Sequence, residues 1–277
     1  MSNDVDRLRV NSNGGNSQMN RHHATVRSML NSACIAATLL IFLCEAGFTQ
    51  ALQNRSVAET CLAANENLSL GAPLPRTFAR LRSGSPLKVV AVGSSSTVGL
   101  WVLNSTGTYP EVMRRELMRL RPNANMEIVN SGRVGDTIQG NVARFDRDVL
   151  SVKPELVIWQ LGTNDIAWGG RADGLKDVII GGVRVLKASG ADVILMDLQY
   201  APMVLASSHH SFMQAIIADV ARQEHVGLFP RFALMLHSIK AGLPSGALVS
   251  WDGLHNSAEG YDCIGRALAR AIIRSAQ

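Results

Sequence analysis

The sequence predicts an α/β fold: a three-layer α/β/α sandwich on a flavodoxin-like, doubly wound sheet of about five mostly parallel strands. Two observations lead to this prediction. From residue 87 onward, short runs of apolar, β-branched residues alternate with longer segments of helical periodicity. The short runs are apolar throughout, which is typical of parallel strands that are covered by helices on both faces.

The expected elements follow one another in chain order. Strands are predicted at residues 87–92, 126–129, 156–161, within 192–198 and at 226–229. Helices are predicted at residues 109–120, 175–188, 211–223 and 257–275. These elements form one domain at residues 87–277, and the carboxyl ends of its strands should carry the functional groups, as in other doubly wound sheets.

The first 86 residues differ from this regular part. Residues 1–32 form a polar and basic leader that we expect to be disordered. Residues 33–51 contain an apolar run after a basic flank, which is typical of a signal peptide. An uncleaved N-terminal membrane anchor through residues 33–52 is the alternative. Both predict export to the periplasm or the extracellular space. Residues 52–86 are predicted to be a linker with one short helix at residues 57–65.

Charge and cysteine usage restrict the classes of partner and site. The 27 basic and 22 acidic residues give a net charge of +5, and only 5% of residues are aromatic. This composition lacks the dense basic stripe of a nucleic-acid-binding protein, so no nucleic-acid partner is predicted. Cys61 and Cys263 would remain after signal cleavage, either paired in an oxidising compartment or as two buried thiols. No Cys/His spacing predicts a metal site.

Four polar, glycine-containing loops stand at or near the expected strand ends. Three follow strands: Gly-Ser-Ser-Ser-Thr-Val-Gly at 93–99, Asn-Ser-Gly-Arg-Val-Gly-Asp-Thr at 130–137 and Gly-Thr-Asn-Asp at 162–165. The fourth, Trp-Asp-Gly-Leu-His-Asn at 251–256, precedes the last helix. The first loop also resembles a phosphate-binding turn, but it lacks the Gly-Lys-Ser/Thr ending. A serine-rich capping turn without chemistry is the simpler interpretation of that segment taken alone.

The spacing of Asp252 and His255 points to acid–base chemistry. An aspartate three residues before a histidine can bind one imidazole nitrogen, which leaves the other nitrogen free to accept a proton from a hydroxyl. The other six histidines have no acid at such a spacing. One Asp-x-x-His motif is weak evidence, but its combination with the three other loops is specific.

This combination resembles the SGNH hydrolases, also called GDSL esterases/lipases, over residues 87–275. Matching the family's Gly-Asp-Ser-x-x-x-Gly block implies that Ser95 is the nucleophile, with Ser94 in place of the usual aspartate. The remaining blocks imply His255 as base and Asp252 as its partner. The Ser95 amide, the Gly135 amide and the Asn164 side chain would form the oxyanion hole. The resemblance implies no cofactor and no metal.

The predicted function is hydrolysis of carboxylic esters by an exported enzyme. Small-molecule, glycan and lipid esters remain open as substrates. Trp101, Trp168 and Asp165 are candidate substrate-binding residues, together with residues 200–210, although both tryptophans could equally belong to the core. Two alternatives are a non-catalytic ligand-binding domain that retains the SGNH fold and a flavodoxin-like nucleotide binder. The latter would leave Asp252 and His255 without a role.

Overall fold

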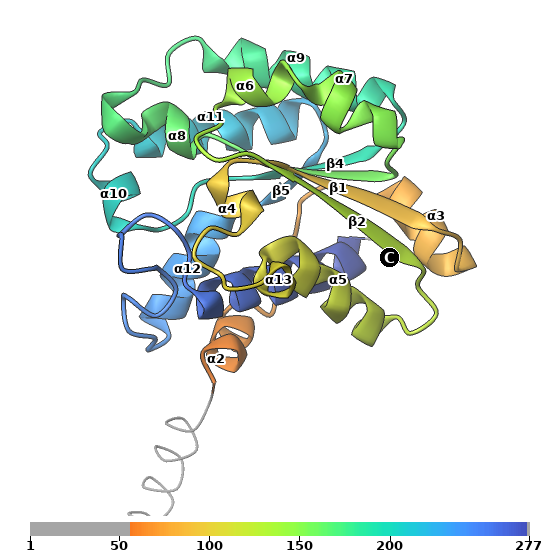
Figure 1. Ribbon diagram of the computed structural model, residues 1–277, viewed down its shortest axis with the longest axis horizontal. Helices are drawn as coiled ribbons and strands as arrows, with labels where there is room; N and C mark the ends of the chain where they lie inside the picture. Colours follow the sequence, from red (N-terminus) through yellow and green to blue (C-terminus); the bar gives the residue numbers. More distant parts are fainter. Residues whose placement is uncertain (1–55, 276–277) are drawn as a thin grey trace, which may run out of the picture. The chain divides into compact units, whose positions relative to one another are not determined.

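Five parallel strands form a single sheet in the computed structural model, which describes residues 56–275 (Figure 1). They are β1 (Leu87–Gly93), β2 (Met126–Gly132), β3 (Leu156–Gln160), β4 (Asp192–Met196) and β5 (Gly227–Phe229). Their spatial order is β2-β1-β3-β4-β5, so the chain reverses its direction of winding between β1 and β3. The predicted fold class is confirmed.

The apolar composition of the central strands explains their position. Every residue of β3 is buried, and in β1 every residue except Lys88 is buried. By contrast, β2 at the edge of the sheet is buried only at Met126. Strands β1 and β3 therefore lie in the core, as expected when helices cover both faces of a sheet.

Helices cover the two faces of the sheet (Figure 1). One face carries α6 (Ile138–Val142), α7 (Phe145–Asp148), α9 (Leu175–Ala188) and α11 (His210–Gln223). The other carries α5 (Tyr109–Leu120), α12 (Arg231–Lys240) and α13 (Ala258–Ser275), and α2 (Val57–Ala64) packs against α12 and α13. The predicted bounds of α5 and α9 agree with the structure, and α11 and α13 begin within one residue of prediction. Helix α12 was not predicted.

The segment expected to be a linker is part of the folded unit. It contains the predicted helix α2 and a second helix, α3 (Pro75–Ser83), which was not predicted. Leu70 and Leu74, between these helices, are buried in the core. Pro75 occupies the first turn of α3, where its fixed φ and missing N–H are favourable.

The carboxyl ends of the strands carry only short elements and loops. These are α4 (Ser95–Val98) after β1, α8 (Thr163–Ile166) and η3 (Ala167–Gly169) after β3, and α10 (Pro202–Leu205) after β4. They lie at the left of the sheet in Figure 1. The remaining short helices are η1 (Ser105–Gly107) and η2 (Leu150–Val152). The three polar loops that follow β1, β2 and β3 therefore lie at the carboxyl end of the sheet.

A disulfide joins Cys61 of α2 to Cys263 of α13, across 202 residues of sequence. Of the two alternatives for these cysteines, the structure has the pair. We expect the Cys61→Ala/Cys263→Ala variant to have a melting temperature about 5–15 °C lower, because the bond restricts the unfolded chain. Calorimetry without reductant measures this difference, and dithiothreitol should lower only the wild-type value. Equal melting temperatures would show that the bond is absent in solution.

Within residues 56–275, no helix is long and apolar enough to cross a membrane. The predicted leader at 1–32 and the predicted signal or anchor at 33–51 lie outside the described residues.

Candidate active site

Residues 93–99, which carry the predicted nucleophile and are called the nucleophile loop below, run from the last residue of β1 through α4. The start of this loop must be glycine, because a Cβ at Gly93 would lie 2.5 Å from Thr97 Oγ1 and 2.7 Å from Gln160 Oε1. This close contact lets the Gln160 amide oxygen accept hydrogen bonds from both the backbone N and the Oγ of Ser94, each at 2.9 Å. Thr97 Oγ1 donates to the same oxygen at 3.2 Å. The loop is therefore tied to the end of β3.

Ser95 is the first residue of α4, and its hydroxyl contacts the ring of His255. The distance from Ser95 Oγ to His255 Nε2 is 2.7 Å. On the opposite side of the ring, His255 Nδ1 lies 2.6 Å from Asp252 Oδ2. Ser95 and His255 are both mostly buried. The structure thus brings together the three residues that were predicted to be catalytic, in one continuous chain of hydrogen bonds.

The Asp252 carboxylate is held by four donors. Asp252 Oδ1 accepts hydrogen bonds from the backbone N–H groups of Leu254 and His255, each at 3.0 Å. Oδ2 accepts the Trp101 indole N–H at 2.7 Å in addition to His255. Partial burial raises the pKa of Asp252, but the hydrogen bonds from His255, Leu254 and Trp101 outweigh it and lower the pKa to about 2. Asp252 is therefore a carboxylate at any pH near neutrality.

Three N–H donors were predicted to bind an oxyanion. The Ser95 amide lies at the start of α4, where helical N–H groups lack intrahelical acceptors. Gly135 lies in the oxyanion loop (residues 133–137) with a φ of +75°, a conformation that favours glycine. Among residues 56–275, nothing accepts a hydrogen bond from the amide of Ser95 or of Gly135. Asn164 Nδ2 donates to Asp136 O at 2.9 Å, which fixes its side chain beside the oxyanion loop.

The predicted substrate-binding residues have different surroundings. Trp101 is half exposed, and its ring packs against that of Trp251 with centroids 5.1 Å apart. Trp168 is exposed and lines a hollow of about 470 Å³ together with Met203. Neither tryptophan is a core residue.

Asp165 has a partner within the protein. Its carboxylate accepts a hydrogen bond from the Ile138 backbone N at 3.1 Å, at the start of α6. Burial raises the pKa of Asp165, and this hydrogen bond opposes the rise. The structure thus shows Asp165 fixing the chain just after the oxyanion loop.

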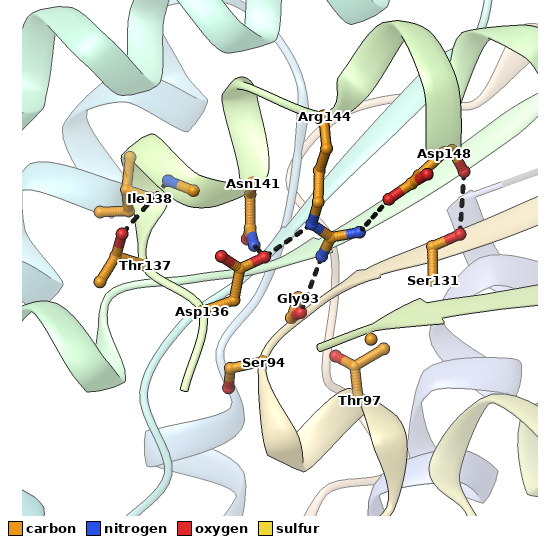
Figure 2. A network of polar contacts seen from close by, with 12 residues as sticks. Gly93, Ser94, Thr97, Ser131, Asp136, Thr137, Ile138, Asn141, Arg144 and Asp148 are labelled. Carbon is orange, nitrogen blue, oxygen red and sulfur yellow. Dashed lines mark hydrogen bonds and ion pairs between the residues drawn. The ribbon is translucent and has the colours of Figure 1, made fainter. Parts of the chain in front are cut away.

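Sequence reasoning missed two residues that organise these loops. Gln160 ends an otherwise apolar strand, and a polar residue there was a signal that could have been used. Arg144 lies on the far side of the oxyanion loop, where its guanidinium contacts Asp136 and the Gly93 carbonyl (Figure 2). No pattern in the sequence indicates those contacts. Within the described part of the chain, no group of His, Cys, Asp or Glu side chains is arranged to hold a metal ion.

Comparison with known proteins places this chain in a family. The model of the Non-GDSL lipase-like family matches residues 60–277. Esterase TesA of Pseudomonas aeruginosa is 26% identical over 167 residues, 60% of this chain and 78% of that protein. An arylesterase of Vibrio mimicus is 22% identical over 187 residues, 68% of this chain and 88% of that protein.

Solved structures show the same fold. An acetyl xylan esterase from Geobacillus stearothermophilus superposes with a TM-score of 0.58 at 22% identity, covering 67% of this chain and 94% of that chain. A two-domain esterase active on acetylated mannans gives a TM-score of 0.64 at 20% identity, covering 74% of this chain. This chain spans about half of that protein, 54% of its length.

The matches confirm two predictions made from the sequence. The resemblance to the SGNH hydrolases holds over the whole regular part of the chain, and the enzyme class is that of the carboxylic ester hydrolases. The chain belongs to the Non-GDSL lipase-like family.

Proposed function

We propose that this protein hydrolyses carboxylic esters through a covalent acyl-enzyme on Ser95, with His255 as general base and Asp252 as its partner. One observation carries the proposal: Ser95 Oγ, both ring nitrogens of His255 and Asp252 Oδ2 form an unbroken chain, with contacts of 2.7 and 2.6 Å. Both distances are within the range needed for proton transfer from a nucleophile to its base.

The chemistry follows from this arrangement. His255 Nε2 takes the proton as Ser95 Oγ attacks the ester carbonyl, and the ionised Asp252 stabilises the imidazolium that forms. His255 then gives that proton to the leaving alkoxide, which departs as the alcohol. In the second half of the reaction, water attacks the acyl-enzyme while His255 again acts as base. Ser95 Oγ recovers a proton as the carboxylic acid is released.

The tetrahedral intermediate carries a negative oxygen that needs donors. We assign this role to the amides of Ser95 and Gly135 and to the Asn164 side chain. The first two have no acceptor among the described residues, and the second hydrogen of Asn164 Nδ2 is available once the first is bound to Asp136 O. Donors that are fixed before the reaction stabilise the developing charge without reorganisation.

The surface around these groups supports an ester with an apolar or ring-containing portion. Exposed large apolar side chains stand in the segments that follow β1, β2, β3 and β4 and in the loop before α13; these are Trp101, Leu103, Val134, Trp168, Leu205 and Trp251. Exposed apolar groups gathered at one site are typical of binding surfaces. We propose O-acyl or O-acetyl esters of small molecules, glycans or lysophospholipids as the substrate class.

A panel of esters tests the proposed activity. Acetyl, butyryl and long-acyl p-nitrophenyl esters, a thioester and an acetylated glycan are each incubated with wild-type protein and with Ser95→Ala. The proposal predicts that wild type hydrolyses at least one oxygen ester and that Ser95→Ala hydrolyses none. Equal rates for the two proteins on every ester would overturn it.

We also propose that the enzyme is exported. The Cys61–Cys263 disulfide supports this, because such bonds persist in oxidising compartments and are rare in the cytosol. Fractionation of producing cells should place the protein outside the cytoplasm. N-terminal sequencing of that material would then distinguish a cleaved signal from a retained anchor, whereas purely cytoplasmic protein would contradict export.

Trp101→Phe should reduce kcat/KM about tenfold, because phenylalanine keeps an aromatic ring but removes the N–H that holds Asp252 Oδ2. Steady-state kinetics on the best ester of the panel measure the change. Trp251→Phe is the matched control: it alters the neighbouring ring but leaves the Trp101 hydrogen bond in place. If both variants lose the same activity, ring packing rather than the hydrogen bond explains the effect of Trp101.

A further inference from the structure

The buried guanidinium of Arg144 contacts both the nucleophile loop and the oxyanion loop. Arg144 directly precedes α7, and only 5% of its side chain is exposed. Figure 2 shows that its nitrogen atoms point toward three separate segments of the chain. Nε donates to Asp136 Oδ2 at 2.6 Å, Nη2 to the Gly93 carbonyl at 3.1 Å, and Nη1 to Asp148 Oδ2 at 3.1 Å.

Two of these segments are the loops that would supply the backbone oxyanion donors. Gly93 ends β1 and stands two residues before Ser95. Asp136 follows Gly135 directly. Arg144 therefore forms a bridge between the nucleophile loop and the oxyanion loop. A planar guanidinium fixes such a bridge in distance and in angle, because its donors point in set directions.

The third proposed donor is connected to the same bridge. Asn164 Nδ2 donates to the carbonyl of Asp136, the residue whose carboxylate Arg144 holds. That carboxylate also accepts a hydrogen bond from Asn141 Nδ2 at 2.6 Å, and its side chain is only 8% exposed. The carboxylate of Asp136 is therefore held by Arg144 and Asn141, while its backbone carbonyl accepts the hydrogen bond that orients Asn164.

We propose that Arg144 is a positioning residue: by tying Gly93 to Asp136, it sets the relative placement of the Ser95 amide, the Gly135 amide and the Asn164 side chain. Arg144 itself does not reach the substrate. The inference rests on the proposed function, since its effect is exerted through the oxyanion hole. It predicts that loss of the guanidinium lowers the rate of the chemical step and leaves ground-state binding of the ester largely unchanged.

Arg144→Lys is the informative substitution. Lysine keeps a positive charge for Asp136, but its single ammonium group does not reproduce the fork that binds Asp136 and the Gly93 carbonyl together. We expect kcat to fall about 10²-fold, the loss typical of a misplacement of about 1 Å, with little change in KM. Asp148→Asn is the matched control. It weakens the outer contact of Arg144, at a side chain that is one quarter exposed, and spares the two loop contacts.

A double-mutant cycle with Asn164→Ala separates positioning from mere stabilisation. In the wild-type and Asp148→Asn proteins, Asn164→Ala should lower kcat about 10²–10³-fold. In Arg144→Lys, where the donor is already misplaced, the same change should cost about tenfold or less. An undiminished effect of Asn164→Ala in Arg144→Lys would overturn the proposal, and so would wild-type kcat in Arg144→Lys.

Circular dichroism melts check that each variant is folded at the assay temperature. If Arg144→Lys is unfolded, Asp136→Asn is measured in its place, because it removes the charge of the pair and keeps an oxygen acceptor for Arg144. The same reduced effect of Asn164→Ala is then expected, and a full effect overturns the inference. Absence of ester hydrolysis by the wild-type protein is a different result: it overturns the proposed function, and the inference falls with it.

Discussion

Ser95→Ala should lower kcat for ester hydrolysis about 10⁶-fold, to the residual rate that binding and the oxyanion donors alone provide. The substitution removes the only hydroxyl that lies 2.7 Å from His255 Nε2 in the described structure. His255→Ala should have an effect of similar size, because the nucleophile then lacks a base. Stopped and continuous assays with the best ester of the panel measure both losses, and both variants should melt near the wild-type temperature.

Ser94→Ala is the matched control, since Ser94 is adjacent in sequence and equally buried. Its hydroxyl donates to Gln160 Oε1 and does not contact His255. We expect a loss of less than about tenfold, equivalent to one hydrogen bond that supports the loop. A larger loss in Ser94→Ala than in Ser95→Ala would show that Ser95 is not the nucleophile.

Asp252→Asn should lower kcat about 10⁴-fold with little change in the fold. An asparagine amide that donates to His255 Nδ1 would force the proton of a neutral ring onto Nε2, which then has no lone pair for the Ser95 proton. The same kinetic assay measures the loss. Activity within tenfold of wild type would show that the carboxylate does not orient the base.

The same variant should change the dependence of stability on pH. The pKa of Asp252 in the folded state is about 2, below the ordinary value of 3.8. The carboxylate therefore stabilises the fold above pH 4, and this contribution is lost as the pH falls toward 2. Urea denaturation at pH 5 and pH 2.5 should show a smaller loss of unfolding free energy in Asp252→Asn than in wild type. An equal loss would contradict the low pKa.

Sequence periodicity predicted the parts of the fold in which local and tertiary preferences agree. The apolar runs that became β1 and β3 are buried on both faces, and the amphipathic helices α5 and α9 have the predicted bounds. Helix α3 was missed because its proline-containing start resembles a linker. Its position depends on tertiary contacts, such as the Thr77 backbone N–H donating to Asp192 Oδ2 at 2.7 Å.

The candidate site shows the same limit. Asp252 and His255 were singled out by their spacing, and Ser95 by its match to the family's first sequence block; the structure brings the three side chains together. Arg144, Gln160 and the hydrogen bond from Trp101 to Asp252 were not found. Each depends on a contact between segments that are distant in sequence; Gln160 and Ser94, for example, are 66 residues apart. Ser94 stands where the family usually has an aspartate. Its hydrogen-bond partner, Gln160, became evident only in the structure.

Labelling with a fluorophosphonate probe tests the central claim most directly, because the probe reacts preferentially with a serine whose hydroxyl is activated by a base. The intact protein is treated with the probe, digested, and analysed by mass spectrometry. The account predicts one labelled site, Ser95, with labelling retained in Ser94→Ala and lost in His255→Ala. No label in the wild-type protein, or label on Ser94 or Ser96 instead, would contradict it.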